Sequence, residues 1–281
     1  MKTIYFHCKI IRTAGLIFFL IITIQSFGQT QKGKVLLKDT NSGIAYVNIG
    51  VVGGNIGTVT DASGDFTIDL DKRYDKDSLR FSMIGFESKS FLISNFKKDS
   101  ISVVYLSSKS YSLPEIKVVY HKPRQVRLGY PVVSNLLRSG FATNDLGSEL
   151  GVKIKVRGTV KLKDINFNVA VCTFDSVTYR LNIYELVNET EYRNILTKPI
   201  YITFTKDKID NAISFDLKNY SIMVEGDILV ALELYRDLGP GSLLFHTEYF
   251  TGSTFRRKTI EGAWIDMAGV IGIYLNGEMV R

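Results

Sequence analysis

The stretch Gly57-Thr58-Val59-Thr60-Asp61-Ala62-Ser63-Gly64-Asp65-Phe66 joins a short apolar segment to a polar corner and to the start of a second apolar segment. Aspartate and serine side chains in such a corner form hydrogen bonds with nearby backbone groups, and glycine adopts positive φ without steric cost. Residues 60–64 are therefore expected to form a tight turn, with Gly64 at positive φ. After the turn, apolar and polar residues alternate over residues 66–70, which predicts a strand with one buried face.

Short strands are expected on both sides of this turn, because β-branched and aromatic residues are separated by turns that contain glycine and aspartate. The expected strands cover residues 34–37, 45–52, 57–60, 65–69, 78–83, 87–93 and 100–106. Seven short strands in about 75 residues suit a Greek-key sandwich. We therefore expect residues 29–106 to fold as an all-β, seven-stranded Greek-key sandwich.

These elements closely resemble the carboxypeptidase regulatory-like domain, a small transthyretin-like β-sandwich. The resemblance rests on Gly33-Lys34-Val35, on residues 40–49 and on residues 57–66, in that order, together with the bend at Ile84-Gly85-Phe86. It covers residues 33–106 and implies a scaffold without chemistry of its own. The domain is similar to the non-catalytic appendage of carboxypeptidases, so the resemblance implies no zinc-dependent peptidase.

The first 28 residues have the pattern of a secretory signal peptide. Three basic residues and no acidic residue precede an apolar run over residues 14–24. This run is too short for a membrane-spanning helix, which needs about 20 apolar residues. We therefore expect cleavage after Gly28 and export, to the periplasm or the outer-membrane surface. An uncleaved anchor helix is the alternative.

Residues 107–128 are expected to form a linker, since the segment that ends at Pro114 is rich in serine. Within the linker, Glu115-Ile116-Lys117-Val118-Val119-Tyr120 is similar to the segment that follows this domain in TonB-dependent receptors, where it can contact TonB. A last strand or a simple tether is the alternative interpretation.

Residues 129–281 are expected to form a second β-sandwich of unknown function. Candidate strands cover residues 151–162, 166–174, 179–187, 200–204, 212–217, 227–235, 242–249, 263–266 and 270–275. About nine strands in some 150 residues suit a jelly-roll-like sandwich. The outline resembles jelly-roll domains of carbohydrate-binding type, and this likeness is one of fold alone. A helical turn is expected only at residues 132–138.

Few residues after position 28 have the spacing of a catalytic or metal site. His121 and His246 lie far apart in the sequence, and Cys172 lies in a strand-like run where it is expected to be a small buried hydrophobe. We therefore expect no catalytic residue, no metal and no cofactor. Four clustered carboxylates leave an accessory glycan-active hydrolase open, although solvated strand ends are the simpler interpretation. They are Glu225, Asp227, Glu233 and Asp237.

The segment from residue 249 to residue 258, together with a following tryptophan, is the candidate ligand site. It is expected to be a Gly-Ser loop flanked by aromatic and cationic side chains, which can stack on a sugar ring or hold an anionic group. The candidate ligand-binding residues are Tyr249, Phe255, Arg256, Arg257 and Trp264. Core aromatics joined by an ordinary basic loop are the alternative.

The net charge of the full chain is +7, and its basic residues are scattered. Nucleic-acid binding would need a concentrated basic patch, so no nucleic-acid partner is expected. No membrane-spanning segment is expected after signal cleavage either. The sequence thus predicts an exported, non-enzymatic scaffold or binding protein of the Gram-negative cell envelope, with a polysaccharide or another envelope protein as its partner. The alternatives are the accessory hydrolase and a component coupled to a TonB-dependent receptor.

Overall fold

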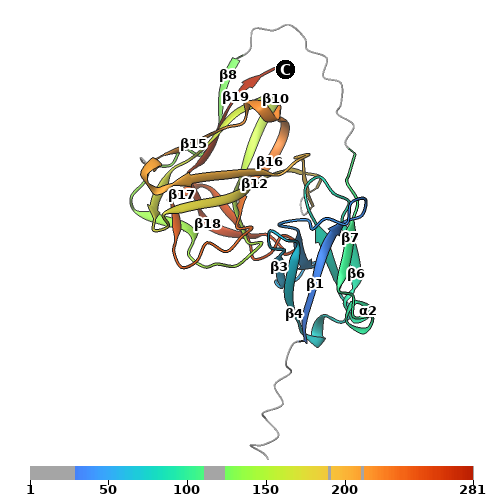
Figure 1. The fold of residues 1–281 in the computed structure, drawn as a ribbon. Coiled ribbons are helices and arrows are strands. Elements are labelled where there is room, and N and C mark those ends of the chain that lie inside the picture. Colours follow the sequence, from blue (N-terminus) through green and yellow to red (C-terminus); the bar gives the residue numbers. More distant parts are fainter. Residues whose placement is uncertain (1–28, 111–123, 189–190, 210–211, 281) are drawn as a thin grey trace, which may run out of the picture.

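The computed structural model describes residues 29–110, 124–188, 191–209 and 212–280. Two β-rich halves follow one another along the chain and contact each other (Figure 1). The expected signal peptide and its cleavage site lie outside the described residues, as do the segment 115–120 and His121.

The N-terminal half is a sandwich of two sheets. Its strands are β1 (Gln29–Leu37), β2 (Asn48–Val51), β3 (Gly57–Val59), β4 (Asp65–Leu70), β5 (Ser78–Ser82), β6 (Lys89–Leu92) and β7 (Val103–Leu106). One sheet has the order β4-β1-β7, and the other has the order β3-β2-β5-β6. Both sheets contribute to one core, in which Val35, Leu70, Phe81 and Val104 are fully buried. The seven strands confirm the expected all-β sandwich.

The turn between β3 and β4 is built as the sequence predicts. Asp61 Oδ1 accepts hydrogen bonds from the backbone amides of Ser63 and Asp65, at 2.8 and 2.9 Å. Gly64 has a φ of 84°, in the left-handed region that favours glycine. In β4, exposed and buried residues alternate, so the strand turns one apolar face to the core.

A short helix, α2 (Ile93–Lys98), differs from the expectation of a strand that extends to residue 93. β6 ends at Leu92, and the helix begins at the next residue. Ile93 and Phe96 are three residues apart and therefore share one face of the helix, where both are fully buried in the core. This burial stabilises a helix of only six residues. Among the described residues, no helix is long and apolar enough to cross a membrane.

The second half is one hydrogen-bonded set of 12 strands. They are β8 (Arg124–Gly129), β9 (Leu137–Phe141), β10 (Glu149–Phe167), β11 (Val169–Cys172), β12 (Ser176–Leu186), β13 (Tyr192–Asn194), β14 (Ile200–Thr205), β15 (Ile213–Asp216), β16 (Met223–Glu233), β17 (Leu243–Arg257), β18 (Ile265–Ile271) and β19 (Ile273–Met279). β10 has a bulge between Val156 and Val160. Before the bulge it pairs with β16 and β17, and after it chiefly with β15 and β19, so β10 belongs to both layers.

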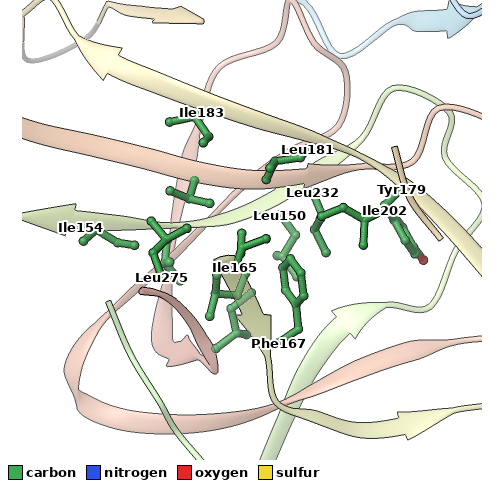
Figure 2. Packing of buried hydrophobic residues seen from close by; sticks show 14 of the residues in the cluster. Leu150, Ile154, Ile165, Phe167, Tyr179, Leu181, Ile183, Ile202, Leu232 and Leu275 are labelled. Atoms are coloured by element: carbon green, nitrogen blue, oxygen red, sulfur yellow. The ribbon is translucent and has the colours of Figure 1, made fainter. Parts of the chain in front are cut away.

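The core of the second half lies between these layers (Figure 2). Tyr179, Leu181 and Ile183 of β12 lie across the core from Ile165 and Phe167 of the distal part of β10. All five are at most 1% exposed. The multi-sheet, all-β architecture expected from the sequence is therefore confirmed here as well.

Three strands of the second half, β8, β9 and β13, are not expected from the sequence. β8 contains two arginines, a glutamine and few apolar residues, and backbone pairing with β19 holds it in place. It lies largely within residues expected to be linker, and the domain boundary itself stays a prediction. Residues 132–138 form no helical turn, because Val132 enters the core and β9 begins at Leu137.

Gly64→Ala is expected to destabilise the protein more than Gly53→Ala. Both glycines have positive φ, where a side chain is strained by about 1–3 kcal/mol. At Gly64 an added Cβ would also lie 2.6 Å from the carbonyl oxygen of Val35, whereas nothing lies within 4 Å at Gly53. The free energy of unfolding, measured by urea denaturation, compares the two variants. Equal losses would show that the turn relaxes around the new methyl group.

Candidate functional site

Four charged side chains form one row across four neighbouring strands of the second half. We call Arg257, Glu149, Glu233 and Arg180 the charged row; they lie in the strand order β17-β10-β16-β12. Glu149 is the cross-strand partner of both Arg257 and Glu233. Glu233 is in turn opposite Arg180. The exposed fractions of the four residues are 8, 0, 0 and 1%, so each charge must find its partner inside the protein.

Hydrogen bonds connect the charged row. Arg180 donates to both carboxylate oxygens of Glu233, with Nε 2.9 Å from Oε2. Arg257 donates through Nε to Glu149. Asn182 Nδ2 donates to Glu149 Oε1 at 2.5 Å and to Glu233 Oε2 at 2.7 Å. Two cations and a shared amide thus offset the repulsion between two adjacent carboxylates.

Burial and neighbouring charges together shift the pKa values of Glu149 and Arg180. It raises the pKa of Glu149, while the Arg257 guanidinium opposes this shift and the Glu233 carboxylate adds to it. For Arg180, burial lowers the pKa, but the facing Glu233 carboxylate outweighs burial and the pKa is raised. Tyr184 Oη donates to Glu149 Oε1 at 2.8 Å and accepts from Arg257 Nη2 at 2.7 Å. The row therefore keeps its arginines charged although solvent does not reach them.

The N-terminal half closes one end of the charged row. Arg180 Nη1 donates to the backbone carbonyl of Tyr46 at 2.8 Å and lies 3.0 Å from Sδ of Met83. The ring of Tyr46 packs edge-on against Tyr235 and Tyr201, with centroid distances of 4.7 and 6.2 Å. One guanidinium thus bonds a carboxylate of the second half and a carbonyl of the first.

The backbone of Tyr46 is held in an uncommon conformation. Its φ is 61°, which is rare for a bulky residue. The hydroxyl of Thr60 donates to the carbonyl of Ile44 at 2.9 Å and accepts from the amide of Val47 at 2.8 Å. The carbonyl of Thr60 accepts from the amide of Tyr46 at 3.2 Å. Thr60 thus fixes the chain on both sides of Tyr46, at the place where Tyr46 meets Arg180.

The turn between β17 and β18, residues 258–264, is a second contact between the halves; we call it the hairpin tip. At its end, Trp264 lies under the guanidinium of Arg257, whose carbon is 4.4 Å from the ring centroid. In its middle, Glu261 Oε1 accepts a hydrogen bond from the hydroxyl of Ser82 at 2.9 Å. The hairpin tip therefore connects the charged row to the β5 strand of the N-terminal half.

The segment expected to be a loop at the candidate ligand site is instead part of a strand, so that expectation is wrong. β17 runs through Leu243–Arg257, with a bulge between Glu248 and Ser253 where its pairing with β18 shifts. Pairing with β10 and β18 outweighs the local preference of Gly252 and Ser253 for a turn.

The structure brings only some of the candidate ligand-binding residues together. Phe255, Arg257 and Trp264 lie near one another on the outer face of the sheet. Arg256 pairs instead with an aspartate of the loop before β10, at 3.8 Å. Tyr249 is 47% exposed and lies across the β17 bulge from the other four residues. Arg257 is already engaged in the charged row, and ligand binding at these residues stays a prediction.

The carboxylates considered for a hydrolase have separate environments. Glu233 is buried in the charged row, whereas Asp227 lies 3.9 Å from Lys153 in an exposed pair. His246 Nδ1 lies 2.7 Å from the carbonyl oxygen of Ser134. Within the part of the chain that the structure describes, no group of three or more His, Cys, Asp or Glu residues is placed to hold a metal ion.

A cleft of about 490 Å³ opens beside Tyr46 at the junction of the halves. Residues 58–62 and 65–67 of the N-terminal half form one wall, and Leu146 with residues 235–237 forms the other. The turn that decides the N-terminal fold therefore also borders this cleft.

The charged row and the junction were not predicted from the sequence. In β12, Arg180 and Asn182 alternate with apolar residues, a pattern that is typical of a solvated outer face. The burial of both faces depends on a contact with a segment that lies 134 residues away in the sequence. A weak signal exists, since Glu149, Arg180 and Glu233 each lie next to strongly apolar residues in a strand.

Arg180→Met is expected to lower the free energy of unfolding by about 3–5 kcal/mol, because it leaves the buried Glu233 carboxylate without its cation. Arg193→Met is the matched control. Arg193 pairs with Glu185, also on β12, but the Arg193 side chain is 72% exposed, so its loss should lower the free energy of unfolding far less. Urea denaturation measures both. Similar losses for the two variants would contradict a structural role for the charged row.

Thr60→Val is expected to cost about 1–3 kcal/mol, because the isosteric side chain leaves the amide of Val47 and the carbonyl of Ile44 unpaired in the interior. Thr58→Val is the control, since Thr58 is partly exposed. Thermal unfolding followed by circular dichroism compares them. A Thr60→Val variant as stable as the control would mean that water replaces the hydroxyl.

Comparison with known proteins gives a family for the N-terminal half. Among solved structures, two matches are the VP2 subviral particle of infectious bursal disease virus and a point mutant of VP2 from the same virus. Each is 9% identical, with TM-scores of 0.16 and 0.15, and each match covers 89% of this chain. This chain spans 64 and 62% of their lengths, and a likeness this low carries no argument. No curated protein matches the chain. Residues 31–118 match the family model of the CarboxypepD_reg-like domain, which confirms the resemblance that begins from residues 57–66.

Proposed function

We propose that this protein is an exported, non-enzymatic scaffold and binding protein of the Gram-negative cell envelope. Its partner is a polysaccharide or another envelope protein, in the periplasm or on the outer-membrane surface. The basic and apolar pattern of the first 28 residues supports export. The match to the CarboxypepD_reg-like domain supports a structural role for the N-terminal half.

The observation that carries this proposal is the closed junction between the halves. Arg180 bonds Tyr46, and the hairpin tip bonds Ser82 through Glu261. A contact that includes buried, charged hydrogen bonds resists hinge motion more than a solvated polar one does. A fixed relation between the two halves would suit a spacer or a docking unit.

Aromatic side chains on the outer face of the second half support a polysaccharide partner. Phe255, Tyr192 and Trp264 are partly buried and belong to one cluster. The rings of Tyr192 and Trp264 lie 6.0 Å apart between centroids. Aromatic rings with one accessible side can pack against the apolar faces of sugar rings.

Expression of the full chain with its own N-terminus in a Gram-negative host tests export. We expect the protein in the periplasmic or outer-membrane fraction. Its intact mass should equal that of the chain from Gln29 to Arg281. A control with Phe18→Asp and Leu20→Asp interrupts the apolar run and should stay in the cytoplasm with residues 1–28 attached. Retention of residues 1–28 on the unmodified protein would contradict the proposal.

Incubation of the exported protein with envelope extracts tests binding without catalysis. We expect it to retain a polysaccharide or an envelope protein and to release no reducing sugar from the bound material. Release of reducing ends above that of a heat-denatured sample would favour the hydrolase instead.

A further inference from the structure

Charged side chains from both halves line the cleft at the junction. Among the residues that the structure describes, Arg236 has no partner for its guanidinium. Asp237 accepts a hydrogen bond from the amide of Gly239 at 2.7 Å, which lowers the pKa of its carboxyl. Asp61 and Asp65 add two carboxylates from the opposite wall, and the Asp65 carboxylate is paired with Lys34 at 2.9 Å. Two carboxylates that have no cationic partner in the described parts of the chain, those of Asp61 and Asp237, thus line the cleft against one guanidinium.

Aromatic and hydroxyl-bearing residues form much of the remaining lining. Tyr46 and Tyr235 lie at the junction with their rings in edge contact, and Thr58 and Thr67 come from the N-terminal wall. The volume of about 490 Å³ lies in the range of about 300–1,000 Å³ that is usual for small-ligand sites. The cleft is therefore large enough for one or two sugar rings.

A bulky residue with left-handed backbone, Tyr46, lies in the wall of this cleft. Left-handed backbone at a bulky residue persists only where the surroundings enforce it, and such places concentrate at ligand sites. Here Thr60 and Arg180 enforce it, and the residue they hold is part of the cleft wall.

We propose that the junction cleft binds a neutral or positively charged saccharide. Carboxylates and a guanidinium are planar groups that can bond two neighbouring sugar hydroxyls at once, and a tyrosine ring can pack against the C–H groups of the sugar. The excess of carboxylates disfavours an acidic saccharide. This inference rests on the proposed binding function and assigns it to the junction instead of the outer face.

The two walls come from different halves, so the cleft exists only while the halves stay docked. The bond from Arg180 to Tyr46 fixes their separation before a ligand arrives. A site that is already ordered loses less entropy on binding than one that must close around its ligand. This gives the charged row a role in binding although none of its members lines the cleft.

Calorimetric titration of the exported protein with three probes tests the inference. The probes are mannohexaose, which is neutral, the glucosamine hexamer, which is cationic, and the galacturonate hexamer, which is anionic. We expect binding of at least one of the first two and none of the third. Preference for the galacturonate hexamer, or no binding of any probe, would overturn the inference.

Two variants in one turn locate the site. Ala62→Trp fills the cleft from its rim and should weaken binding at least tenfold, whereas Ser63→Trp, at the exposed neighbouring position that does not line the cleft, should change affinity less than twofold. Arg236→Ala removes a guanidinium without a partner in the fold and should weaken binding by about ten- to 150-fold, as expected for one charged hydrogen bond. Unchanged circular dichroism and melting temperature confirm that all three variants are folded.

The outcomes separate this inference from the proposed function. Full affinity in folded Ala62→Trp with loss of affinity in Phe255→Ala would overturn the junction site and place the saccharide on the outer face. Capture of an envelope protein by a chain that binds none of the probes would also overturn the inference, while the proposed binding function would stand. Loss of affinity in Ala62→Trp and Arg236→Ala, but in neither Ser63→Trp nor Phe255→Ala, would support it.

Discussion

The guanidinium of Arg180 is the group on which the arrangement of the two halves depends. It is 1% exposed and bonds the Glu233 carboxylate on one side and the Tyr46 carbonyl on the other. The N-terminal half both covers this guanidinium and accepts its hydrogen bond; a docked arrangement without the Tyr46 carbonyl would leave a buried donor unpaired, at a cost of about 1–3 kcal/mol or more. The N-terminal half is thus a part of the electrostatic interior of the second half.

The placement of two glutamates side by side makes the strand register of the second half specific. Glu149 and Glu233 are direct cross-strand partners, which would be repulsive without Arg180, Arg257 and Asn182 around them. A shift of either strand by one residue would turn its glutamate into the apolar core. The charged row adds little net stability by itself, because burial costs most of what the pairing gains. The charged row is therefore expected to act mainly by disfavouring other registers and other docking positions.

Local sequence signals predicted the elements that depend on local interactions. The turn at residues 60–64, the positive φ of Gly64 and the seven strands of the N-terminal half all follow from patterns within about ten residues. The charged row joins residues 108 positions apart, and the junction joins residues 134 positions apart. The alternation of polar and apolar residues in the sequence of a strand is the same whether water or another domain covers its polar face. The sequence therefore predicts a loop over residues 249–258, although long-range pairing places residues 249–257 in a strand.

The turn at residues 60–64 also determines how the N-terminal half contacts the second half. Asp61 folds the turn, and this brings Thr60 against the segment around Tyr46. Thr60 then holds Tyr46 in a left-handed conformation, which directs its carbonyl toward Arg180. Any residue can supply a carbonyl, so this contact depends on backbone geometry more than on the tyrosine side chain. Substitution of Tyr46 by glycine would keep the bond to Arg180 and relieve the strain, whereas the tyrosine ring contributes its contact with Tyr235 and part of the cleft wall. The strained tyrosine therefore contributes to both features, since its ring packs against Tyr201 and Tyr235 at the junction and forms part of the cleft wall.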